Sequence, residues 1–187
     1  MLMGRSMHIH GQSIFDVFAK PVVADDGVSV RYDGFATFIQ GERQFTYMLV
    51  DGAAYVVEST GNDTTSAATQ TVRCLESLTP FDSIVSALNT VKAVPRSLVD
   101  YEANICPSGN FFQTSTPFGG VNFTLCASTT SGFIAYGGDI MMAVEYLDGP
   151  LRNITAPKLS DSSAHCAIVV TAPAVTPTAA TLLTGEN

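Results

Sequence analysis

The sequence lacks tryptophan and is poor in histidine, in basic residues and in charge. It has 9 Lys plus Arg against 17 Asp plus Glu, a formal net charge of −8, and only 3 histidines. Binding of nucleic-acid phosphates requires clustered Lys and Arg, and attachment to an anionic membrane surface requires a polybasic segment. This composition excludes a nucleic-acid binder that works through a basic patch, and it excludes a polybasic membrane anchor.

Long apolar runs and catalytic motifs are also missing. No run reaches the ~18 apolar residues of a membrane span, and there is no nucleophile elbow, zinc-protease motif, phosphate-binding loop or dinucleotide fingerprint. His8 and His10 have chelating spacing but lie in a polar N-terminal stretch, and His165 adjoins Cys166. Sequence neighbours on a strand point to opposite faces, which disfavours a His–Cys nucleophile pair. We therefore expect a non-enzymatic protein without a cofactor or metal site.

The abundant residues are Ser and Thr, which number 36, while charged residues make up 14%. Such a chain is typical of a mainly β protein. Apolar and polar residues alternate over 28–39 and again over 45–57, and Asp51-Gly52 is a strong hairpin signal. The pattern predicts antiparallel strands in one curved sheet, a half-barrel. Residues 1–12 are predicted to be a flexible arm, 13–170 a single domain, and 171–187 a tail rich in Pro, Thr and Ala.

One amphipathic helix is predicted over residues 80–92. Thr79 and Pro80 provide a typical start, and Pro95 ends the segment. The apolar side chains recur at helical spacing and form one stripe, namely Phe81, Ile84, Val85, Leu88 and Val91. We expect this stripe to pack on the concave face of the sheet.

The cysteines stand at positions 74, 106, 126 and 166, and none forms a close pair of the kind found in zinc sites. A hairpin of 111–115 with 121–127 would bring Cys106 near Cys126. We therefore predict a Cys106–Cys126 disulfide, which leaves Cys74 for Cys166; four free thiols are the alternative. Disulfides indicate an oxidising compartment. The N-x-S/T triplets at Asn62, Asn122 and Asn153 are potential glycan acceptors, so the chain is predicted to be a secreted glycoprotein.

Several segments together resemble the LolA-like fold of secreted lipid-binding proteins, the group that includes the ependymin-related proteins. These are the run from Phe45 to Tyr55, the pair Cys74-Leu75, the Val94-Pro95 that ends the helical segment, and the later runs 104–109, 122–128 and 140–147. The resemblance covers roughly residues 14–166. It implies an open antiparallel half-barrel whose concave face, plugged by helices, holds acyl chains. This chain departs from the pattern in having a single clear helix.

The function expected on these grounds is secretion and non-enzymatic binding of a small hydrophobic ligand between sheet and helix. Five strand positions on the assumed inner face and one helix position are predicted to line the ligand space: Phe35, Tyr47, Tyr55, Leu88, Phe123 and Met142.

A second interpretation remains open. The segment Gly138 to Tyr146 is similar to the last strand of many small icosahedral coat proteins, and the run Tyr146 to Pro150 with the Thr/Pro/Ala-rich end resembles tymovirus coats. This resemblance implies an eight-stranded jelly roll that self-associates into a capsid, with the protein located in the virion.

Overall fold

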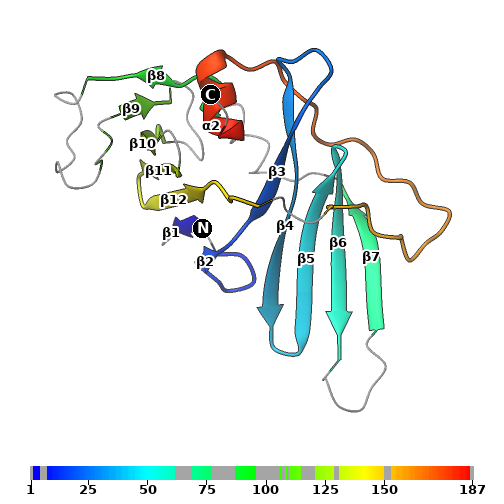
Figure 1. The fold of residues 1–187 in the computed structure, drawn as a ribbon. Helices are drawn as coiled ribbons and strands as arrows, with labels where there is room; N and C mark the ends of the chain where they lie inside the picture. The colour runs from blue at the N-terminus through cyan, green and yellow to red at the C-terminus, as the bar shows by residue number, and fades with distance from the viewer. Residues whose placement is uncertain are drawn as a thin grey trace.

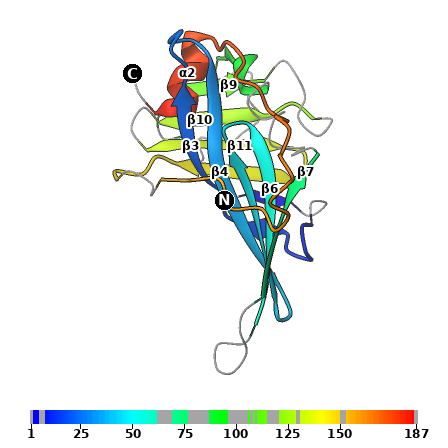
Figure 2. The same ribbon diagram turned by 90° about the vertical axis from the view of Figure 1, so that its right-hand side faces the viewer.

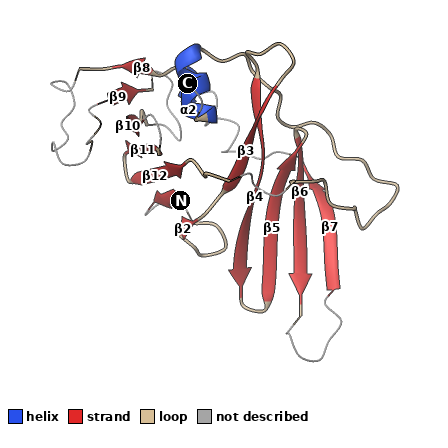
Figure 3. Ribbon diagram, in the orientation of Figure 1, coloured by secondary structure: helices blue, strands red, loops and turns tan. Residues whose placement is uncertain are grey.

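The computed structural model describes residues 2–4, 8–61, 69–76, 87–95, 106, 108, 110–114, 121–128, 131–149 and 153–185, with residues 2–4 described by their backbone alone. It is mainly β, as predicted, and all strand pairs are antiparallel. The strands of the described residues form two sheets, one of seven strands and one of five (Figures 1 and 3), which is compatible with the predicted half-barrel class and with the jelly-roll alternative. The strands of the two sheets run crosswise (Figure 2).

The five-stranded sheet is a meander in chain order. Its strands are β3 (Phe18–Val23), β4 (Val30–Gln40), β5 (Arg43–Val50), β6 (Ala53–Thr60) and β7 (Thr69–Leu75). Asp51 and Gly52 connect β5 to β6 with φ angles of 51° and 79°. Two central residues with positive φ match the twist of a two-residue hairpin, so the hairpin signal read from the sequence is confirmed.

The seven-stranded sheet combines the strands between residues 92 and 145 with the first two strands of the chain. In spatial order its strands are β2 (Ile14–Phe15), β1 (Leu2–Gly4), β12 (Ile140–Glu145), β11 (Gly132–Gly137), β10 (Thr124–Ser128), β9 (Asn110–Gln113) and β8 (Lys92–Ala93). The predicted pairing of the β9 and β10 segments is confirmed. Residues 14–23 divide between β2 and β3, which belong to different sheets.

Residues 2–4 and 9–12 pair or pack with other parts of the fold, which differs from the flexible arm predicted over 1–12. Strand β1 pairs with both β12 and β2. The ring of His10 stacks on Phe45 with 4.1 Å between ring centroids, and its nitrogens lie 3.1 Å from Gln40 Oε1 and 2.9 Å from the Tyr47 hydroxyl. These pairings and contacts are long-range, and a polar composition does not reveal them.

Within the segment predicted as a tail over 171–187, the structure has the helix α2 (Pro177–Thr184). Thr176 is the N-cap, its side chain accepting from the Ala179 amide, and Pro177 opens the first turn. Gly185 ends the helix in the left-handed region. The helix has three buried residues, which pack into the main hydrophobic core against β10 and β11: Ala179, Leu182 and Leu183.

The helix predicted over 80–92 falls mostly outside the described residues, and so do Phe81, Ile84 and Val85. Residues 87–89 are helical, and β8 begins at Lys92, so the helix ends earlier than predicted. Leu88 and Val91 are 5% and 9% exposed and belong to the same core as α2. The burial expected for these two side chains is confirmed.

Two tyrosines fasten the end of α2. The Tyr32 hydroxyl donates to the Leu183 carbonyl at 2.6 Å, and the Tyr146 hydroxyl donates to the Leu182 carbonyl at 2.9 Å. Burial raises the pKa of both hydroxyls, and for Tyr32 the neighbouring Tyr146 adds to the effect.

These raised pKa values predict a loss of stability at alkaline pH. The folded protein retains both phenolic protons at a pH where the unfolded chain, with tyrosine pKa near 10.0, has released them. The stabilisation is therefore complete below about pH 10 and is lost as the pH rises above it. We expect the double variant Y32F/Y146F to be less stable at pH 8 by about 1–3 kcal/mol, for two lost hydrogen bonds, and to lose less stability between pH 10 and 11.5. Urea unfolding across this pH range measures both effects; a slope equal to that of the wild type would contradict the assignment.

The five-stranded sheet has two distinct faces, because cross-strand partners share a face and successive residues alternate. One face, here called the core face, carries Ala36, Phe38, Tyr47 and Val56. Its Ala36 and Phe38 form a second cluster with Phe15 of β2. The other face is here called the strap face, because the chain segment 153–176 crosses it. It carries Phe18, Phe35, Met48, Tyr55 and Cys74, paired in a row from β3 to β7.

Candidate functional site

The chain between β12 and α2 crosses the strap face of the five-stranded sheet, and we call residues 153–176 the strap. Figure 2 shows it running in front of β6 and β7 before it rises to α2. Ser160 binds both main-chain groups of Val72 on the edge strand β7: its amide donates to the Val72 carbonyl at 3.1 Å, and its hydroxyl accepts from the Val72 amide at 2.8 Å. Farther along, the amides of Val169 and Val170 both donate to the Gly52 carbonyl. The strap therefore protects part of a sheet edge that would otherwise be open to pairing.

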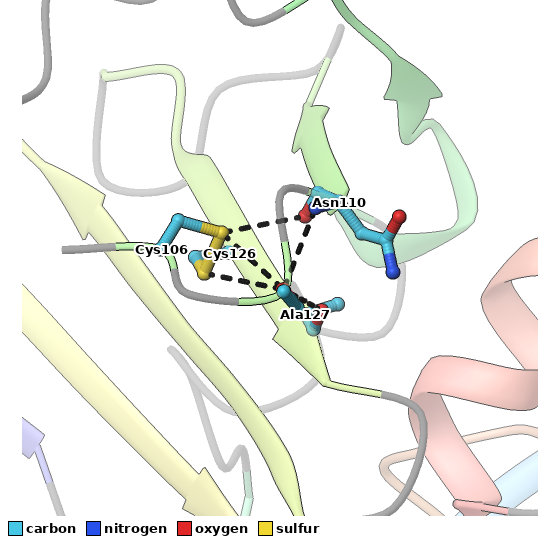
Figure 4. Close-up of a disulfide and its surroundings, with 5 residues drawn as sticks. Cys106, Asn110, Cys126 and Ala127 are labelled. Atoms are coloured by element: carbon cyan, nitrogen blue, oxygen red, sulfur yellow. Dashed lines mark hydrogen bonds between the residues drawn. A yellow bond between two sulfur atoms is a disulfide. The ribbon is translucent and has the colours of Figure 1, made fainter. Parts of the chain in front are cut away.

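A disulfide between Cys74 of β7 and Cys166 of the strap fixes this arrangement covalently, with an S–S distance of 2.02 Å. The second disulfide joins Cys106 to Cys126 of β10 (Figure 4). Beside it, the Ser108 hydroxyl donates to the Ala127 carbonyl at 2.6 Å. Both disulfides join the pairs predicted from the sequence, and all four cysteines are accounted for.

A hollow of about 400 Å³ lies between Tyr55 of β6 and the strap. It is a shallow surface depression that is widely open to solvent. Its apolar lining comes from the Tyr55 ring, Pro157, Leu159, Ala164 and the Cys166 end of the disulfide. The polar lining consists of Lys158, Asp161, Ser162 and His165. Polar and apolar surface contribute about equally to this lining, so a ligand held here would meet both kinds of contact.

The polar groups of the hollow differ in what they already bind. Asp161 Oδ1 accepts from the amide and the hydroxyl of Ser163, at 2.9 and 2.7 Å, and these hydrogen bonds lower the pKa of the carboxyl group. His165 Nδ1 lies 2.7 Å from the Ala164 carbonyl. A carbonyl can only accept, so Nδ1 is the donor in this contact. None of the ion pairs among the described residues involves Lys158 or Asp161.

An apolar row leads away from the hollow across the strap face. Tyr55 pairs with Met48, Met48 with Phe35, and Phe35 with Phe18. The Phe18 and Phe35 rings stack with 5.3 Å between centroids, yet Phe18 remains 42% exposed. Strands in a sheet lie about 4.8 Å apart, so the row from Tyr55 to Phe18 spans roughly 14 Å.

The six residues predicted to line one ligand space do not lie together. Phe35 and Tyr55 are on the strap face, whereas Tyr47 is on the core face beside Phe38. Leu88 and Phe123 are buried in the main core, and Met142 packs against both core clusters. Of the six residues, Tyr55 alone lines the hollow.

The strap residues of the hollow belong to no motif, so residue patterns do not identify them. One signal is present in the sequence nonetheless. A bond from Cys74 to Cys166 brings the strap against β7, and the β6 strand that carries Tyr55 is the preceding one in the meander. The predicted Cys74–Cys166 bond, combined with the observed pairing of β6 with β7, places the strap near Tyr55.

The structure describes two of the three predicted glycan acceptors. Asn122 and Asn153 are exposed, and Asn62 lies outside the described residues. Exposure is a requirement for a glycan acceptor and does not test modification itself.

Within the part of the chain that the structure describes, no helix has the length and apolarity needed to cross a membrane. No three His, Cys, Asp or Glu side chains of the described ranges gather closely enough to hold a metal ion. Comparison of the chain with protein-family models, with curated proteins and with solved structures finds no match in any of the three.

Proposed function

We propose that this protein is an extracellular, non-enzymatic binder of a small hydrophobic ligand, which it holds in the hollow between Tyr55 and the strap. The observation that carries this proposal is the combination of a 400 Å³ hollow with the apolar row that continues from it to the exposed Phe18. The volume falls within the range of about 300–1,000 Å³ that is usual for small-ligand sites, and the row supplies the apolar surface beside it.

The arrangement suits reversible binding. The apolar side chains of the row are presented by four hydrogen-bonded strands, so little backbone ordering is needed when a ligand arrives. The strap side of the hollow is held by the Cys74–Cys166 disulfide and by Ser160. Two disulfides also fit an oxidising, extracellular environment. The resemblance to the LolA-like fold points to the same ligand class.

Filling the hollow should abolish binding. Ala164 lies on the strap and lines the hollow, so A164F places a ring in the ligand space without altering a core residue. We expect A164F to weaken binding of a dansylated undecanoic acid at least tenfold in a fluorescence titration. The matched control is A93F, at an exposed position of β8 in the other sheet, which should bind like the wild type.

Organic extraction of the purified protein followed by lipid analysis tests whether a hydrophobic ligand is carried from its source. Absence of saturable binding by the wild type, together with an empty extract, would refute the proposal. Equal affinities of A164F and A93F would show that binding occurs elsewhere. Native mass spectrometry supplies a further test, because assembly into a large closed shell would favour a capsid subunit instead.

A further inference from the structure

We infer that the ligand of the hollow is a single-chain amphiphile with a zwitterionic head group. This inference rests on the proposed function and specifies its ligand class. The hollow is lined by one full positive charge, Lys158, and one full negative charge, Asp161, in the same short segment of the strap. A zwitterionic head group matches this charge pattern, with its anionic part toward Lys158 and its cationic part toward Asp161.

The two charges are available to a ligand. The ion pairs formed among the described residues join Arg31 or Arg43 to other carboxylates and leave Lys158 and Asp161 without a counter-charge. Ser163 binds Asp161 through Oδ1 and keeps the carboxyl group ionised, since its hydrogen bonds lower the pKa. Serine is neutral, so the negative charge is not compensated. A ligand with one charge would be attracted at one residue and repelled at the other.

Tyr55 favours a cationic group on the same ligand. Its ring lines the hollow together with Asp161, and aromatic faces attract ammonium groups, quaternary ones included. The remaining part of the ligand is apolar, because Tyr55 continues into the row of Met48, Phe35 and Phe18. The row crosses four strands in a line roughly 14 Å long, which suits a single acyl or alkyl chain laid across them.

The test compares three dodecyl amphiphiles that differ in head group: dodecylphosphocholine, dodecyl sulfate and dodecyltrimethylammonium. Isothermal titration calorimetry of the full chain below the micelle concentration gives the three affinities. The variants are K158Q and D161N, the latter retaining Oδ1 as an acceptor for Ser163. The controls K92Q and D148N change the net charge equally at exposed positions outside the hollow.

We expect the wild type to bind dodecylphosphocholine most tightly of the three. An exposed charge contact is worth up to about fivefold in affinity. Relative to its control, D161N should therefore shift the preference about threefold to fivefold toward dodecyl sulfate, and K158Q should shift it as far toward dodecyltrimethylammonium. If D161N and K158Q have the same head-group preferences as their controls, the zwitterion inference is overturned. Binding that A164F abolishes would in that case still support the proposed function. If none of the three amphiphiles binds saturably, the proposed function itself fails.

Discussion

Replacing Cys74 and Cys166 together by alanine should lower the free energy of unfolding by about 4–5 kcal/mol. The bond closes a loop with a sequence separation of 92, and the entropy of an unfolded chain released from such a loop corresponds to roughly 4.6 kcal/mol in the chain-entropy model. For a domain of this size the melting temperature should fall by roughly 10 °C or more. Urea unfolding and calorimetry of the oxidised wild type and of C74A/C166A measure the difference.

The second disulfide provides the matched comparison. Cys106–Cys126 closes a loop with a sequence separation of only 20, which corresponds to about 3.3 kcal/mol in the same model. C106A/C126A also removes atoms from a buried position, since Cys106 is 1% exposed. Ligand binding should separate the two double variants more clearly than stability does. C74A/C166A frees the strap and should lose ligand binding, whereas C106A/C126A should keep it. Retained binding in C74A/C166A would show that the disulfide does not hold the site.

Truncating Leu182 to alanine should destabilise the protein by about 2–5 kcal/mol, because the change removes buried methyl groups and leaves a cavity. Leu182 is 4% exposed and belongs to the core that joins α2 to β10 and β11. An effect of this size is typical of a core residue, although the segment that contains Leu182 is rich in Pro, Thr and Ala and has the composition of a linker. The free energy of unfolding from urea titration at pH 7 gives the value.

A substitution on the exposed side of the same helix separates packing from helix formation. Thr178 is exposed in the first turn of α2, and alanine has the higher helix propensity. T178A should therefore leave the stability within about 0.5 kcal/mol of the wild type. If L182A were as stable as T178A, α2 would not be docked in solution. The main hydrophobic core would then lack the three buried side chains that α2 contributes to it.

Local patterns in the sequence determined the features that depend on neighbouring residues. The alternation in β4, β5 and β6 predicted their strands, and Asp51-Gly52 predicted the turn between two of them, because turn conformation depends on residues with access to positive φ. The pairing of Cys106 with Cys126 followed from one hairpin, and Cys74 with Cys166 followed as the remaining pair. Each of these features depends on residues close together in the sequence, or, for Cys74 and Cys166, on the pair left when the other is assigned.

Tertiary structure decided which face of each strand is used and where the chain ends pack. Alternation shows that a strand has two faces but does not show which face meets which partner, and so Tyr47 and Tyr55 were assigned to one face although they lie on opposite ones. The N-terminal strand β1 and the helix α2 are short elements. Their stability comes mainly from distant partners, for β1 the strand β12 and for α2 the main core. The hollow beside Tyr55 likewise exists only where the strap crosses the sheet, because its walls come from segments about 100 residues apart in the sequence.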